Sequence, residues 1–185
     1  MNTVVTSKEQ ILNTSRELLQ TEGCKSINIR AVATACGVSV GSIYNYFDSK
    51  EELVRETVES IWFEIFHLSE QDESYGDIIT CVKELYQRME EGCEKYPGFF
   101  MLHSMSFARK EKESGKQRMQ EAWMHIIRCL CSVMEHDPNI RKDAFNESFS
   151  CKNFADVIFS LMLASMLRQN YDPSNLLEVI RRTVY

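Results

Sequence analysis

The stretch from Asn28 to Leu53 limits the possible folds of this chain more than any other part of it. Asn28 is a good helix cap, and Gly37 supplies the left-handed residue that ends a helix at the least cost. Between these two residues the apolar side chains recur at the spacing of one helix face, at Ile29, Val32, Ala33 and Cys36. The pattern therefore predicts a short helix that is closed at both ends.

Two more helix starts follow directly. Ser39 can cap a helix that ends at Tyr46 or Phe47. Ser49 and Glu52 then have the spacing of a capping box, in which a serine and a glutamate satisfy backbone N–H groups at the start of a helix. The stretch thus predicts a helix, a tight turn, a very short second helix and the capped start of a third.

The rest of the chain also has the pattern of helices. Its 185 residues include only 7 Gly and 3 Pro, and 44% of them are apolar. Few helix breakers and long stretches with a helical period predict an all-α protein, with about nine helices. We expect a three-helix N-terminal domain over residues 1–48 and an antiparallel helical bundle over residues 49–185, with a helix over 49–68 connecting the two.

The cysteines and the apolar runs indicate the class of protein. The 7 cysteines are odd in number and irregularly spaced, which is typical of free, buried thiols. His125 and Cys129 share a helix face, as metal ligands require, but Cys129 and Cys131 point about 200° apart. The chain opens with polar residues, unlike a secretory leader, and no apolar run is long enough to span a membrane. We expect a cytoplasmic protein without a metal or another cofactor.

The short middle helix has the features of a helix that enters the major groove of DNA. Such a helix is exposed on one face and held by a helix behind it. Ile43 and Phe47 face the supporting helix, whose Ala33 and Gly37 are small enough for a close crossing. The other face carries hydroxyl and amide groups for phosphates and base edges, an apolar side chain that suits a thymine methyl group, and a glycine that lets backbone approach the duplex: Ser39, Val40, Gly41, Ser42, Tyr44 and Asn45.

Three ordinary packed helices would show the same periodicity, so the spacing alone leaves both interpretations open. The formal net charge of -6 is not that of an obvious nucleic-acid binder. Residues 1–50, in contrast, hold five basic and four acidic side chains, a net charge of +1. Any affinity for DNA must therefore be local to this part of the chain.

A resemblance separates the two interpretations. It is carried by Val32-Ala33, Ala35-Cys36-Gly37-Val38-Ser39, Gly41-Ser42-Ile43-Tyr44, Tyr46-Phe47, Ser49-Lys50-Glu51 and Leu53. At these positions the chain resembles the TetR family of bacterial transcriptional regulators, and the similarity extends upstream over residues 11–23. The resemblance implies a homodimer, most often a repressor, in which the first three helices bind DNA and the remaining helices bind a ligand and form the dimer.

The resemblance also implies site residues. The DNA contacts carried over to this chain are Arg30, Ser39, Val40, Gly41, Ser42, Tyr44, Asn45, Tyr46 and Lys50, with the Tyr46 ring packed inward while its hydroxyl reaches out. A segment rich in methionine and aromatic residues, together with side chains that could face it, predicts a ligand pocket lined by Trp62, Phe66, Phe100, His103, Met105, Phe107, Trp123, Ile127, Phe159 and Met162. The last two helices predict a dimer interface at Phe154, Ile158, Leu161, Ser165, Leu176 and Ile180.

The sequence therefore predicts a regulator that is not an enzyme. It would bind a pseudo-palindromic operator as a homodimer, and a small, largely apolar effector would release it. No nucleophile with an adjacent base and no phosphate-binding glycine loop supports an enzyme. Two alternatives stay open, a helical adaptor for protein interactions that does not bind DNA, and a regulator that responds to thiol oxidation or to a metal.

Overall fold

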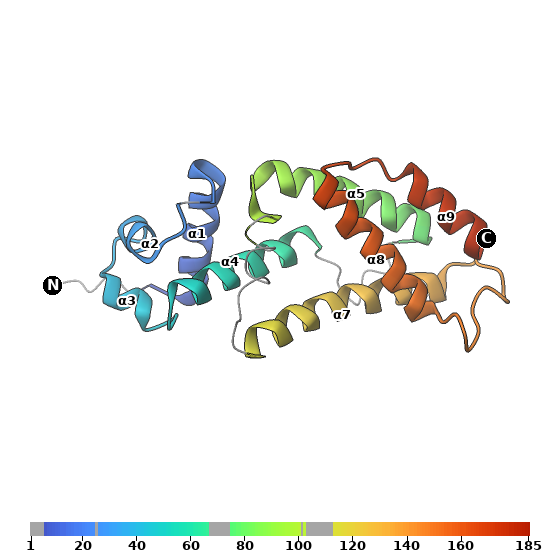
Figure 1. Cartoon of the computed structure of the whole chain (residues 1–185), viewed down its shortest axis with the longest axis horizontal. Helices are drawn as coiled ribbons and strands as arrows, with labels where there is room; N and C mark the ends of the chain where they lie inside the picture. The colour runs from blue at the N-terminus through green and yellow to red at the C-terminus, as the bar shows by residue number, and fades with distance from the viewer. Residues whose placement is uncertain (1–5, 25, 67–74, 101, 103–112) are drawn as a thin grey trace. The chain divides into compact units, whose positions relative to one another are not determined.

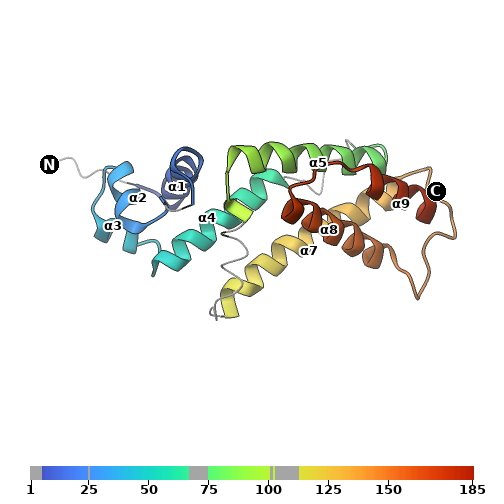
Figure 2. The ribbon, with the colours of Figure 1, turned by 45° about the horizontal axis from the view of Figure 1, so that its top comes forward.

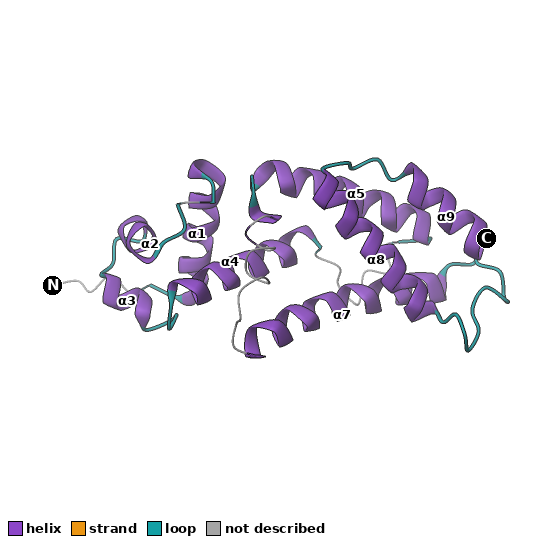
Figure 3. Ribbon diagram, in the orientation of Figure 1, coloured by secondary structure: helices purple, strands orange, loops and turns teal. Residues whose placement is uncertain are grey.

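The structure is a computed structural model that describes residues 6–24, 26–66, 75–100, 102 and 113–185, with the backbone alone for 113–119. These residues form eight helices and no strand (Figure 3), which confirms the predicted all-α class. The helices are α1 (Lys8–Glu22), α2 (Ile29–Ala35), α3 (Val40–Tyr44), α4 (Lys50–Ile65), α5 (Ile78–Lys95), α7 (Glu113–His136), α8 (Cys151–Arg168) and α9 (Ser174–Val184).

The chain forms two compact units. The first comprises residues 1–64 and 92–117, and the second comprises residues 65–91 and 118–185. Two helices are shared, since α4 ends one residue inside the second unit and the last turn of α5 belongs to the first. None of the described helices is long and apolar enough to cross a membrane.

Capping side chains set the helix starts of the first unit. The Ser7 and Gln10 side chains form a complete capping box at α1, and the Asn28 side chain accepts a hydrogen bond from the Ala31 N–H at α2. At α4, the Ser49 Oγ accepts from the Glu52 N–H at 3.1 Å, while the Glu52 carboxylate accepts from the Asp48 N–H. The helix starts expected at Asn28 and Ser49 are thus confirmed.

The core of the first unit holds the three N-terminal helices together. α2 packs against both α1 and α3, as Figures 1 and 2 show. Ile11 and Leu19 of α1, Val32 of α2, Ile43 of α3 and the following Phe47 are completely buried. Gly37 adopts a φ of +67° between α2 and α3, the left-handed conformation that favours glycine. The short middle helix is therefore held rigidly from behind.

A buried carboxylate connects the ends of three helices in the second unit. Asp137, after α7, accepts hydrogen bonds from the Ile78 N–H at the start of α5 (3.0 Å) and from the Tyr185 hydroxyl after α9 (2.5 Å). Burial disfavours the charged form, but these bonds and those from Asn139 outweigh it and lower the pKa of Asp137. One side chain therefore fixes the ends of three helices.

Candidate nucleic-acid interface

α3 is a five-residue helix with one buried face and one exposed face. The Ser39 Oγ accepts from the Ser42 N–H at 3.1 Å, and the two serine hydroxyls lie 2.9 Å apart. Ile43 is completely buried, whereas Val40 is 40% and Tyr44 50% exposed. Large apolar and aromatic groups normally leave water, so their exposure on this rigid helix favours a binding surface.

The structure places the predicted DNA-contact residues as a group on the surface. Ser42 is half-buried and the others are exposed: Arg30, Ser39, Val40, Gly41, Tyr44, Asn45, Tyr46 and Lys50. A Cβ added to Gly41 would meet only the Ser39 hydroxyl, at an ordinary contact distance of 3.7 Å. The absence of a side chain at Gly41 is therefore not required by the packing of the monomer.

Tyr46 differs from the prediction. Its hydroxyl donates a 2.6 Å hydrogen bond to the carbonyl oxygen of Thr6, which is buried just before α1. The expected outward-reaching hydroxyl is thus occupied by the N-terminal segment. No local sequence pattern predicts this bond, because its partners lie 40 positions apart and one of them is a backbone group.

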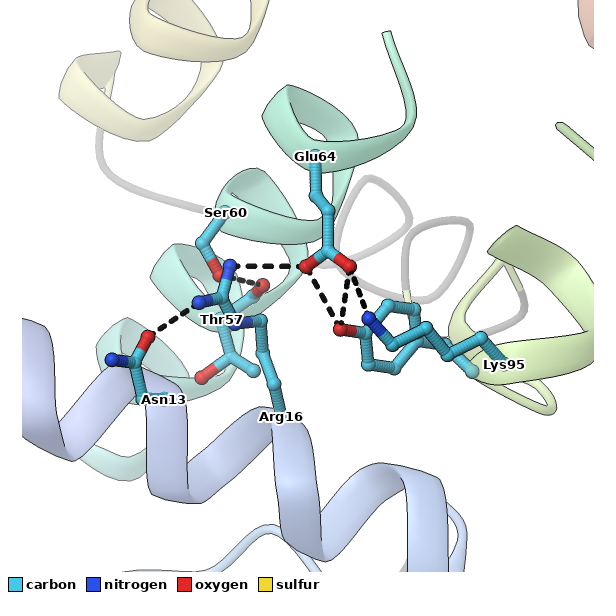
Figure 4. Close-up of polar contacts among 7 residues, drawn as sticks. Asn13, Arg16, Thr57, Ser60, Glu64 and Lys95 are labelled. Atoms are coloured by element: carbon cyan, nitrogen blue, oxygen red, sulfur yellow. Dashed lines mark hydrogen bonds and ion pairs between the residues drawn. The ribbon is translucent and has the colours of Figure 1, made fainter. Parts of the chain in front are cut away.

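Glu64 joins three segments of the first unit, as Figure 4 shows. Its carboxylate lies 3.2 Å from the Arg16 Nη1 of α1 and 2.5 Å from the Lys95 Nζ of α5, and it accepts a hydrogen bond from the Tyr96 hydroxyl at 2.8 Å. Partial burial opposes ionisation, but the hydrogen bonds from Lys95 and Tyr96 and the charges of Lys95 and Arg16 outweigh it and lower the pKa of Glu64. An ionised carboxylate therefore links α1, α4 and the end of α5.

A cavity of about 370 Å³ lies between α7 and α8 in the second unit. It is lined by Gln120, Trp123, Met124, Ile127, Asp156, Phe159, Ser160 and Leu163. Trp123, Ile127 and Phe159 belong to the predicted ligand residues. The α8 contribution lies at positions 156, 159, 160 and 163, a one-face spacing that sequence analysis could have used to find Asp156.

The other predicted ligand residues do not line this cavity. Trp62 and Phe100 belong to the first unit, where their ring centroids lie 6.4 Å apart. Phe66 and Met162 are buried in the second unit, and the Phe66 ring packs edge-on against Phe159. His103, Met105 and Phe107 lie outside the described residues. The predicted set is thus divided between two units and does not form one pocket.

Known proteins resemble the N-terminal helices in sequence. A model of the family described as bacterial regulatory proteins, tetR family, matches residues 11–57, which run from α1 into α4. These N-terminal helices are therefore similar to the TetR family, over about a quarter of the chain. It is 33% identical over 52 residues to the HTH-type transcriptional regulator UidR of Escherichia coli K12. That match spans 28% of this chain and only 26% of the length of UidR.

Solved structures resemble nearly the whole chain in fold. The transcriptional regulator SCO7518 of Streptomyces coelicolor A3(2) superposes with a TM-score of 0.64, covering 96% of this chain and 97% of its own at 21% identity. BioQ, solved with its double-stranded DNA operator, superposes with a TM-score of 0.58 at 15% identity, covering 94% of this chain and 96% of its own. At these identities the likeness shows the fold alone.

Most of the predicted dimer residues are buried inside the second unit. Phe154, Ile158, Ser165, Leu176 and Ile180 are at most 6% exposed, because they pack inside the second unit. Their side chains are not available to a second copy, and only Leu161 of the predicted set is exposed, at 37%. The exposed apolar side chains of the last two helices are instead Val157, Leu161, Leu167 and Val179.

None of the seven cysteines, all of which lie in the described residues, forms a disulfide. The Cys129 Sγ lies 3.6 Å from the His125 Nε2, and the Cys151 Sγ lies 3.7 Å from the Cys131 carbonyl oxygen. Burial raises the pKa of the Cys81 thiol to about 12 and raises the pKa of Cys131 and Cys151. These thiols stay protonated at neutral pH, which disfavours rapid oxidation.

Proposed function

We propose that this chain is a DNA-binding transcriptional regulator whose α3 reads the major groove. The observation that carries the proposal is the exposed face of α3, with Val40, Tyr44 and Asn45 outward and the helix fixed by buried Ile43. This face lies inside the segment that matches the TetR family model. BioQ, which shares the fold, was solved with a double-stranded DNA operator.

The exposed side chains divide between base contacts and phosphate contacts. Val40 offers an apolar contact to a thymine methyl group, and Asn45 offers an amide for a base edge or a phosphate. Tyr44 contributes a hydroxyl, while Arg30 and Lys50 contribute positive charge for phosphates. The Ser39 and Ser42 hydroxyls already bond each other and the α3 backbone, so their first role is to hold the helix.

The regulator acts as a homodimer in this proposal. Two copies of α3, held about one helical turn of DNA apart or slightly more, would read a pseudo-palindromic operator in successive major grooves. The surface proposed to join the copies carries Val157, Leu161 and Leu167 of α8 and Val179 of α9, the large exposed apolar side chains of these helices. Pairs of C-terminal helices from two subunits form four-helix interfaces of a common type.

In this proposal the regulator is a cytoplasmic repressor of transcription. A small effector that binds in the second unit controls its binding to DNA. The cavity between α7 and α8 is the proposed effector site, since apolar and aromatic side chains dominate its lining. Binding changes DNA affinity only if the effector has different affinities for the two states of the dimer.

Gel-shift titration with the DNA upstream of the protein's own gene tests this function. The unmodified chain is expected to shift this DNA in the presence of excess unrelated duplex. Tyr44→Ala and Lys50→Ala should each weaken binding by about 1–3 kcal/mol, the usual loss for one good contact, while the chain keeps its helical content and its oligomeric state. Equal affinity of all three proteins for specific and unrelated DNA would instead support the adaptor alternative.

A further inference from the structure

We propose that the cavity between α7 and α8 takes a flat, aromatic organic cation. This rests on the proposed function only in taking the cavity as the effector site. The cavity volume, about 370 Å³, is at the lower end of the roughly 300–1,000 Å³ that is typical of ligand sites, so the ligand is small.

The aromatic part of the lining sets the shape of the ligand. The rings of Trp123 on α7 and Phe159 on α8 have centroids 6.0 Å apart and planes inclined at 63°. Two inclined rings form a corner in which a flat ring system can stack on one and meet the edge of the other. Met124 and Leu163 add adaptable apolar surface around this corner.

The charge of the lining sets the charge of the ligand. Among the lining residues whose side chains the structure describes, Asp156 is the one ionisable residue, beside the neutral polar Gln120 and Ser160. The structure records no ion pair between Asp156 and any described residue, including Lys152 one turn earlier on α8. A carboxylate beside two aromatic rings attracts a cation both by its charge and through the negative ring faces, and it repels an anion. The net charge of -6 adds a long-range preference of the same sign.

The cavity lies on a different face of α8 from Val157 and Leu161 of the proposed dimer surface, whereas Leu167 of that surface lies on the same side as Asp156, three turns further along the helix. Asp156, Phe159 and Leu163 are spaced to lie along one side of the helix, while Val157 and Leu161 lie roughly 100° or more away by helical geometry. A second copy that packs on Val157 and Leu161 therefore leaves the side of Asp156 for a ligand.

Isothermal titration of the full chain with three matched probes tests the charge preference. The probes are 9-aminoacridine, acridine and acridine-9-carboxylate, which share one flat skeleton and are respectively cationic, neutral and anionic at pH 7. We expect the cation to bind roughly tenfold more tightly than the neutral probe, because it gains a partly exposed charge pair with Asp156 and a cation–π contact with the lining rings. The anion should bind most weakly.

Two variants test whether Asp156 causes the preference for the cationic probe. Asp156→Asn should remove the charge-pair part of the preference for the cation, leave the smaller cation–π part, and leave the affinity for the neutral probe unchanged. Asp143→Asn makes the same charge change at a side chain that is 87% exposed outside the cavity, and it should preserve the preference. The proposal is overturned if the neutral probe binds as tightly as the cation, if Asp156→Asn keeps the full preference, or if no probe binds. Because no DNA is present, each of these results leaves the DNA-binding proposal to its own test.

Discussion

Replacing Glu64 tests whether its carboxylate, which links α1, α4 and the end of α5, stabilises the first unit. Glu64→Gln keeps an acceptor for the Tyr96 hydroxyl but removes the charge facing Arg16 and Lys95, whose side chains are 26% and 47% exposed. Ion pairs of such exposure contribute about 0.2–1 kcal/mol each, so the loss should be about 1 kcal/mol.

Glu64→Ala should cost more. It also removes the acceptor of the Tyr96 hydroxyl, on a tyrosine that is only 3% exposed. An unsatisfied buried donor costs about 1–3 kcal/mol, which brings the expected total to about 2–4 kcal/mol. Glu94→Gln is the matched control, because Glu94 is exposed in the same unit and a surface change of this kind stays within about 0.5 kcal/mol.

Hydrogen exchange measured by mass spectrometry shows in which helices the Glu64 variants lose stability. Peptides from α1 and from residues 92–98 should exchange faster in Glu64→Ala, less so in Glu64→Gln, and unchanged in Glu94→Gln, while α8 peptides stay constant. Because the pKa of Glu64 is lowered, its contribution is complete above the ordinary value of 4.5 and disappears as the pH falls through the folded value. Equal exchange of α1 in all three variants would refute the role of Glu64.

Three further predictions concern the reading face, the second unit and the dimer. Gly41→Ala should leave the melting temperature within about 2 °C of the parent, because its Cβ meets only ordinary contacts, yet weaken operator binding in a gel shift by at least about 1 kcal/mol; equal affinity would show that backbone does not approach DNA there. Asp137→Asn should lower the free energy of urea unfolding by about 1–3 kcal/mol at pH 7, and since the pKa of Asp137 is lowered, the difference should shrink as the pH falls below the ordinary value of 3.8; a constant difference would contradict the assignment. Leu161→Glu should raise the dimer dissociation constant at least about tenfold in analytical ultracentrifugation, while Glu178→Gln on α9 should not; an unchanged constant would move the interface elsewhere.

Local rules predicted α2 and α3 well. The caps at Asn28 and Ser39 act within three residues of their partners, and the stop at Gly37 depends on one backbone conformation. Such features are fully encoded in a short window of sequence, so periodicity and capping chemistry are sufficient.

Long-range contacts account for what the sequence did not predict. The Tyr46 hydroxyl is taken by the Thr6 carbonyl, and Glu64 meets Lys95 31 positions further along the chain. On α8, apolar character alone could not separate interior from exterior. The rotation of the helix depends on packing against other helices, including the bond between Tyr86 of α5 and Ser165 and the ring contact between Trp123 and Phe159. The most apolar face of α8 therefore became the core, and the exposed apolar side chains Val157 and Leu161 lie on another face of the helix.

Selection of DNA from a random-sequence library by the unmodified chain tests the central claim most directly. Bound duplexes should converge on an inverted repeat whose half-sites lie about one helical turn apart or slightly more, because two copies of α3 enter successive major grooves. The Tyr44→Ala protein should fail to enrich the same motif. Recovery of unrelated sequences by the unmodified chain, with no repeat and no dependence on Tyr44, would contradict the account.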